Sequence, residues 1–148
     1  MGGLFVRDRN LWLACSPDGL AKDDSSAEKF GILEIKCPFS SEPVSNLMKS
    51  TSFYLYKRNG ETHLKQNHEY FIQVQHHMAV LDRPWCDFTA FTAKNSTFSI
   101  VVMHVSKNEE FWASHFLKLE KFFMDVAIPE IAQAAIQSEL LEVCVQDE

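Results

Sequence analysis

Gly31-Ile32-Leu33-Glu34-Ile35-Lys36-Cys37-Pro38 alternates apolar and charged side chains with a period of two and ends at a proline. This pattern is typical of a β-strand, because successive side chains of a strand point to opposite faces and proline cannot donate to a ladder. Glu34 and Lys36 therefore share one face, and Leu33 and Ile35 share the other. The stretch predicts a strand that carries a carboxylate and an ammonium group about 6.5 to 7 Å apart along its length.

A second carboxylate precedes this strand. Asp18 lies in the turn Ser16-Pro17-Asp18-Gly19, and fifteen residues separate it from Glu34. Two neighbouring carboxylates can bind a hard cation such as Mg²⁺, and Lys36 could then hold an attacking water near a phosphate. The pattern therefore predicts phosphodiester hydrolysis. The same short pattern also arises by chance, in which case Glu34 and Lys36 form an ordinary solvated face.

Three antiparallel strand pairs are expected around this strand. Each joins two runs rich in apolar or β-branched residues through a polar turn. The pairs are Phe5–Arg7 with Leu11–Cys15, Phe53–Tyr56 with Thr62–Lys65 across Asn59-Gly60, and Trp85–Thr92 with Thr97–Val105 across residues 93–96. Residues 22–29 are polar and are expected to form a loop.

The clearest helix follows the second strand pair. Asn67 is its expected N-cap, and its buried stripe is expected at helical spacing, on Tyr70, Val74, His77, Met78 and Leu81. Gln73 lies at the edge of this stripe, where an unpaired amide is costly, so we expect it to bind Lys36 or water around a metal. The alternative is a surface glutamine that binds bulk water. Gln75 points about 200° away and is expected to be solvated or structural.

Length and composition place the chain among folded domains. Its 148 residues are 46% hydrophobic, which predicts one compact core, and two further helices are expected at residues 108–123 and 129–141. No run of apolar residues is long enough to cross a membrane and no secretory leader is visible, so membrane insertion and secretion are not expected.

The four cysteines lack zinc-site spacing and predict free thiols in a reducing compartment, the cytoplasm or nucleus. The adjacent His76 and His77 point to different sides of a helix, which argues against a metal site made of histidines alone.

Charge is unevenly distributed along the chain. The net charge is −6, and residues 107–148 hold 3 basic and 9 acidic side chains, whereas residues 29–65 hold 6 basic and 3 acidic ones. A polyanion should therefore meet the middle segment, although an excess of this size also occurs on ordinary surfaces. The candidate DNA-binding side chains are Ser16, Lys49, Lys57, Arg58, Lys65 and Tyr70.

Three linked motifs resemble the YqaJ viral recombinase family. They are Leu13-Ala14-Cys15-Ser16-Pro17-Asp18-Gly19-Leu20, then Gly31-Ile32-Leu33-Glu34-Ile35-Lys36-Cys37-Pro38-Phe39, then Tyr70-Phe71-Ile72-Gln73-Val74-Gln75, and the resemblance runs from about residue 3 to 129. That family is similar to the phage lambda-type exonucleases of the PD-(D/E)xK nuclease superfamily. The resemblance implies an α/β (α+β) fold, a restriction-endonuclease-like mixed β-sheet flanked by helices. It predicts one such domain over residues 1–148, with residues 107–148 as its acidic C-terminal helices.

The resemblance also implies an activity and its residues. The activity is a Mg²⁺-dependent exonuclease, with Mn²⁺ as a substitute, that degrades one strand of duplex DNA from its 5′ end during recombination and repair. Asp18 and Glu34 match the metal-binding carboxylates, and Ile35 would offer its backbone carbonyl to the metal. Lys36 matches the catalytic lysine, and Gln73 matches the glutamine of a Tyr-x-x-Gln motif that begins at Tyr70. The implied partners are double-stranded DNA ends, a single-strand annealing protein and two further copies in a ring-shaped trimer.

One departure from the family pattern keeps other functions open. Family members carry an upstream helical region with a further acidic residue and basic residues for the 5′ phosphate, and the sequence as given starts just before the first expected hairpin. We therefore expect an N-terminally truncated domain with weak activity. A DNA-binding or assembly module without catalysis is the first alternative. A sequence-specific endonuclease is the second, although no segment is obviously suited to reading bases.

Overall fold

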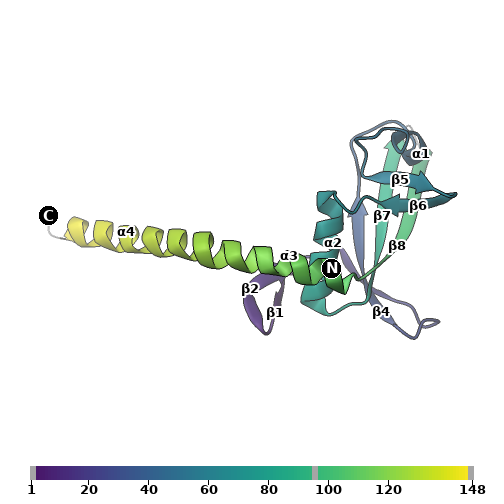
Figure 1. The fold of residues 1–148 in the computed structure, drawn as a ribbon. Coiled ribbons are helices and arrows are strands. Elements are labelled where there is room, and N and C mark those ends of the chain that lie inside the picture. Colours follow the sequence, from purple (N-terminus) through teal and green to yellow (C-terminus); the bar gives the residue numbers. More distant parts are fainter. Residues whose placement is uncertain (1–2, 95–96, 147–148) are drawn as a thin grey trace. The chain divides into compact units, whose positions relative to one another are not determined.

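The computed structural model describes residues 3–94 and 97–146, with side chains through residue 137. The chain divides into two compact units, Met1–Asn108 (unit 1) and Glu109–Glu148 (unit 2). Figure 1 shows strands and helices in unit 1 and helix alone in unit 2. No helix in the described part of the chain is long and apolar enough to cross a membrane.

The centre of unit 1 is a mixed sheet of four strands. Its strands are β3 (Gly19–Lys22), β4 (Phe30–Lys36), β7 (Trp85–Lys94) and β8 (Thr97–Ser106), in that spatial order. β3 and β4 are antiparallel, β4 and β7 are parallel, and β7 and β8 are antiparallel. The strand predicted from residues 31–37 thus lies inside the sheet, with partners on both sides.

Helix α2 (Glu69–Leu81) packs against β4 and β7. It belongs to the connection between these two parallel strands, together with the short helix α1 (Val44–Leu47) and the hairpin of β5 (Leu55–Arg58) and β6 (Glu61–Leu64). The hairpin turns at Asn59 and Gly60, whose φ angles of 53° and 86° lie in the left-handed region, as the Asn-Gly pair predicts. A further hairpin, β1 (Phe5–Arg7) with β2 (Asn10–Cys15), also contacts α2.

The two faces of the sheet differ in burial. Residues paired across strands share a face, and Ile32, Glu34, Phe88 and Met103 are all buried on the same side. The opposite face carries exposed apolar side chains, among them Ile35, Phe98, Ile100 and Val102. Glu34 therefore lies on the covered face of the sheet. This mixed α+β architecture is compatible with the PD-(D/E)xK nuclease fold that the sequence predicts.

Several details differ from the sequence predictions. The N-cap of α2 is His68, whose ring accepts a hydrogen bond from the Tyr70 amide, and not Asn67. Strand β3 was not predicted, because the Gly-Leu-Ala-Lys sequence of this edge strand is short and has no β-branched or aromatic residue. In α2, Tyr70 and Leu81 are only partly buried.

Unit 2 is a continuous helical segment and not two separate helices. It consists of α3 (Glu109–Phe122), a π-helical turn over Phe123–Ala127 and α4 (Ile128–Gln146). Pro129 lies in the first turn of α4, as predicted. Its ring would clash with the carbonyl of Asp125 in a regular α-helix, and the wider π turn at that position relieves the clash. That both units belong to one nuclease domain stays a prediction.

Candidate active site

Asp18 stands at the start of edge strand β3, beside β4. Its Oδ2 accepts a hydrogen bond of 2.7 Å from the backbone amide of Ile35. Gly19 pairs with Leu33 in the antiparallel ladder, so the register continued by one residue sets Asp18 across from Glu34. The turn at Ser16-Pro17-Asp18-Gly19 thus brings the first predicted carboxylate to the strand that carries the second.

Glu34 is a buried carboxylate with one hydrogen-bonded oxygen and one oxygen that lies close to an imidazole. Its exposed fraction is 2%. Oε1 lies 2.6 Å from Lys36 Nζ, and Oε2 lies 3.4 Å from His77 Nδ1. Burial alone would raise the pKa of Glu34, but the hydrogen bonds and charges of His77 and Lys36 outweigh it and hold that pKa below its usual value. The carboxyl group is therefore ionised where it lies.

Lys36 is held by three groups on the covered face of the sheet. Besides Glu34, its ammonium donates to Gln73 Oε1 at 2.9 Å and lies 4.6 Å from the centre of the Tyr70 ring. An ammonium over an aromatic face is attracted by the ring's quadrupole. The expected contact between Gln73 and Lys36 is therefore present, and it links strand β4 to helix α2.

Helix α2 presents one face to the strand. Tyr70, Gln73 and His77 follow one another at spacings of three and four residues, which places them on one side of an α-helix. Tyr70 is fixed in turn by edge-on contact with Tyr54 and by its packing near Phe88. The spacing of His77 from Gln73 was visible in the sequence, but only the structure shows that this histidine contacts Glu34.

Gln75 takes the structural one of its two expected roles. Its side chain is fully buried and not solvated. Its amide nitrogen donates to the Ser106 carbonyl at 3.0 Å, and its amide oxygen accepts from the Asn108 amide at 2.7 Å. Gln75 therefore has the structural role that was its alternative, since it satisfies backbone groups where the chain leaves β8.

The donor set suits a hard cation. Asp18 and Glu34 supply carboxylate oxygens, which are the ligands that Mg²⁺ prefers. The N–H and C=O of one strand residue point to the same edge of the strand. The Ile35 N–H binds Asp18, so the Ile35 carbonyl points to that edge as well. The first pair of the β3–β4 ladder is Gly19 with Leu33, so Ile35 lies beyond the paired part of β3. Within residues 3–94 and 97–146, no group of three or more His, Cys, Asp or Glu side chains forms a metal cluster. The available set is thus two carboxylates and one carbonyl, and their role as ligands stays a prediction.

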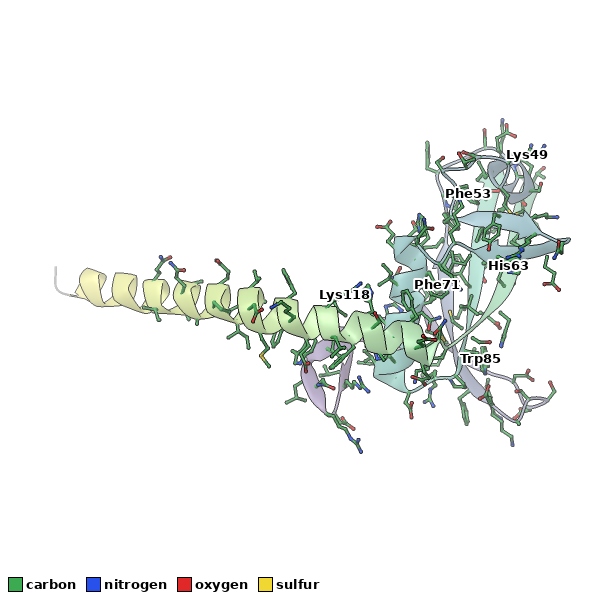
Figure 2. All side chains as sticks on the ribbon, viewed as in Figure 1. Lys49, Phe53, His63, Phe71, Trp85 and Lys118 are labelled. Atoms are coloured by element: carbon green, nitrogen blue, oxygen red, sulfur yellow. The ribbon has the colours of Figure 1, made fainter. Side chains whose placement is uncertain are left out.

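The predicted DNA-binding side chains differ in their exposure and contacts. Ser16 is exposed, two residues before Asp18. Lys49, Lys57 and Arg58 are exposed in the connection between β4 and α2, and Figure 2 shows Lys49 at the end of unit 1 that carries α1. Lys65 instead binds the Thr51 carbonyl. These cations follow the carboxyl end of β4, where Lys36 lies, and their contact with DNA stays a prediction.

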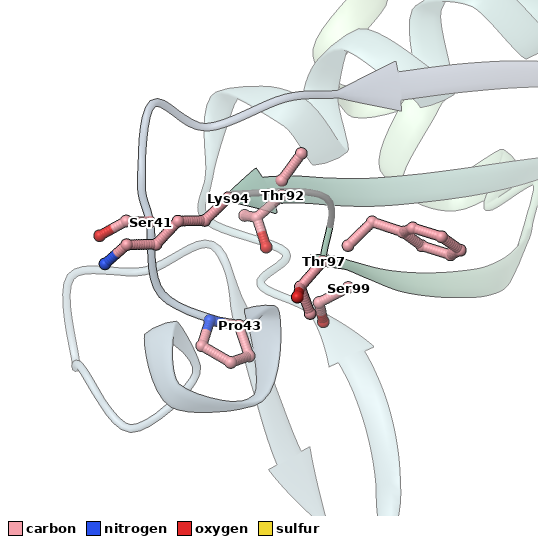
Figure 3. A pocket seen from close by; sticks show the side chains of 8 residues that line it. Ser41, Pro43, Thr92, Lys94, Thr97 and Ser99 are labelled. Atoms are coloured by element: carbon pink, nitrogen blue, oxygen red, sulfur yellow. The ribbon is translucent and has the colours of Figure 1, made fainter.

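Two adjoining pockets open beyond Lys36. One begins at Cys37 and is lined by the following residues through Ser41 and by residues 91–93. Figure 3 shows the other, lined by Ser41, Pro43, Thr92, Ala93, Lys94, Thr97, Phe98 and Ser99. Hydroxyl groups, one lysine and the Phe98 ring line the second pocket. It was not foreseen because its residues come from two separate places, the start of the connection after β4 and the turn end of the β7–β8 pair.

The comparisons with known proteins agree with the motifs. No curated protein matches this chain. The family model described as YqaJ-like viral recombinase domain matches residues 1–91, which contain Asp18, Glu34, Lys36 and Gln73. This match indicates a nuclease family that functions in recombination and whose members typically use divalent metals. With more than half of its length matched, the chain belongs to the YqaJ-like viral recombinase domain family.

Proposed function

We propose that this protein is a metal-dependent DNA exonuclease that hydrolyses linear duplex DNA from its 5′ end during recombination and repair. One observation carries the proposal. Lys36 joins Glu34 of the same central strand and Gln73 of helix α2 through contacts of 2.6 and 2.9 Å, and Asp18, just before the edge strand, binds the Ile35 amide of that central strand at 2.7 Å. Two acids and a lysine in such a network are what phosphodiester hydrolysis requires.

The residues of this site have separate roles in the proposed reaction. Asp18, Glu34 and the Ile35 carbonyl would hold Mg²⁺ or Mn²⁺, which when bound supplies Lewis acidity and lowers the pKa of water. Lys36 orients the attacking water and stabilises negative charge that develops on the phosphate. Gln73 and Tyr70 keep the ammonium of Lys36 in place, so that it needs little reorganisation during the reaction.

The substrate approaches from the carboxyl end of β4 in this proposal. The exposed Lys49, Lys57 and Arg58 would contact phosphates there, without reading sequence. The partners proposed are double-stranded DNA ends, a single-strand annealing protein and two further copies of the chain in a ring.

Digestion of two DNA forms side by side tests the function. A linear 5′-phosphorylated duplex and a covalently closed circle are incubated with Mg²⁺, Mn²⁺ or Ca²⁺. We expect Mg²⁺ and Mn²⁺ to support loss of the linear duplex alone, and Ca²⁺ to bind without supporting cleavage. Glu34→Gln, which keeps shape and removes charge, should be inactive. Cleavage of the closed circle would favour an endonuclease, and binding without cleavage would favour an assembly module.

A further inference from the structure

The contact between His77 and Glu34 extends the site by one turn of α2. His77 Nδ1 and Glu34 Oε2 are 3.4 Å apart, with 8% and 3% of their side chains exposed. Neither buried atom has a hydrogen-bond partner among the described residues, so the two atoms face each other at close range without a well-aligned hydrogen bond. A buried polar atom without a partner costs about 1 to 3 kcal/mol, so each of these atoms is the natural partner of the other.

The chemistry of the two atoms fixes the direction of the bond. A carboxylate oxygen can only accept, whereas the Nδ1 of a neutral imidazole donates or accepts according to its tautomer. Two acceptors facing each other in a buried site would repel. The Nδ1–H tautomer of His77 is therefore the one able to donate to Glu34 Oε2.

We propose that His77 is a positioning residue for Glu34, an inference that rests on the proposed function. Lys36 holds Oε1 and His77 holds Oε2, so the carboxyl group cannot rotate about its last bond without losing one partner. His77 thereby keeps the Glu34 carboxyl group in one orientation. Hydrogen bonds of this kind to a metal-binding carboxylate typically affect metal affinity by roughly 10- to 100-fold.

Calorimetric titration of the whole chain with Ca²⁺ alone tests this role without any need for turnover. His77→Leu fills the space but removes the donor, and His77→Asn keeps an N–H at a similar distance from the backbone. We expect the leucine variant to bind Ca²⁺ about 10- to 100-fold more weakly than the parent and the asparagine variant to recover most of the loss.

A second histidine provides a matched control. His104 Nδ1 lies 3.0 Å from Asp87 Oδ1, so it forms the same kind of pair on the exposed face of the sheet. His104→Leu should leave the Ca²⁺ affinity unchanged. An equal loss in both variants would show a general effect of removing an imidazole and would overturn the proposal.

Two further outcomes separate this inference from the function beneath it. If Glu34→Gln weakens Ca²⁺ binding but His77→Leu does not, the inference fails and the metal site stands. If the parent binds no Ca²⁺, or Glu34→Gln binds it as the parent does, both fail. If the circular dichroism spectrum shows that His77→Leu does not fold like the parent, the tautomer of His77 in the parent is measured instead, by ¹⁵N spectra of histidine-labelled protein. A protonated Nδ1 on His77 supports the proposal, and an unprotonated Nδ1 overturns it.

Discussion

At the scale of single residues, the site depends on the surroundings of one carboxylate. Glu34 is almost fully buried, which disfavours its charge, and its two oxygens face Lys36 and His77. Removing either partner would leave a buried charge only half compensated, a change that is strongly destabilising in proteins. The network must therefore form as a unit.

The depressed pKa of Glu34 predicts how stability depends on pH. Because hydrogen bonds from His77 and Lys36 outweigh the effect of burial, the native state binds fewer protons than the unfolded state below the ordinary glutamate pKa of about 4.3. This contribution is complete above that pH and is lost as the pH falls through the lower, folded-state value. Urea unfolding from pH 6 to 3 should therefore show a steeper loss of stability in the parent than in Glu34→Gln. Parallel curves would contradict the assigned pKa direction.

Lys36 should be separable from metal binding. Its ammonium contacts Glu34 and Gln73 but is not itself a metal ligand, so Lys36→Ala should lose turnover by about 100-fold or more, the size typical of a group that stabilises charge in the transition state. Ca²⁺ affinity, measured by calorimetry, should change far less than in Glu34→Gln. A loss of Ca²⁺ affinity as large as that of Glu34→Gln would show that Lys36 acts on metal binding and would contradict its assigned role in the reaction.

At the scale of elements, strand β4 is shaped by close packing against β7. A Cβ on Gly31 would lie 2.2 Å from Cδ2 of Trp85, far inside contact distance. The indole is also fixed, since its N–H donates to the Glu28 carbonyl at 2.7 Å. Glycine at position 31, three residues before Glu34, therefore lets β4 approach Trp85 closely.

Gly31→Ala should test this packing. The ring cannot move without losing its hydrogen bond, so we expect the variant to be less stable by about 1 to 3 kcal/mol, the usual cost of overpacking a core. Chemical denaturation measures the difference. Gly3→Ala is the control, because its Cβ would meet nothing within 4 Å. Equal stability of Gly31→Ala and the parent would show that the strands separate freely at this point.

The elements also show what the sequence could predict. Strand β4, the β7–β8 pair and the Asn59-Gly60 turn were predictable because alternation and turn chemistry are local signals. The contact of Gln73 with Lys36 followed from helical spacing together with the family motif. The contact of His77 with Glu34 did not, because it depends on the distance between a helix and a strand that lie more than forty residues apart in the chain. The sequence leaves open which of its two expected roles Gln75 takes for the same reason, since its partners lie at the end of β8.

At the scale of the whole molecule, the two units differ in net charge. Unit 2 holds 2 basic and 9 acidic side chains, a formal −7, and the net charge of −6 leaves +1 on unit 1. Charges of one sign act over about 10 Å at 0.1 M salt and further at lower salt. Unit 2 should therefore repel any DNA that comes within this distance of it.

Removing some of this charge should strengthen DNA binding at low salt. The triple variant Glu110→Gln, Glu120→Gln and Glu130→Gln lowers the negative charge without changing side-chain size. Fluorescence anisotropy with a labelled duplex should show tighter binding than the parent at 50 mM salt and equal binding near 1 M, because salt screens the repulsion. Ser114→Ala, also in unit 2, is the neutral control. An unchanged affinity at 50 mM would show that unit 2 does not influence the path of DNA.

The central claim is that Asp18 and Glu34 bind one divalent cation beside Lys36. Crystals grown or soaked with Mn²⁺ test it directly, because anomalous scattering locates the ion without reference to activity. The predicted result is a peak within about 2.0 to 2.6 Å of carboxylate oxygens from both residues and of the Ile35 carbonyl. Mn²⁺ bound elsewhere, or carboxyl oxygens of Asp18 and Glu34 more than about 8 Å apart, would contradict the claim, since no single ion could reach both groups.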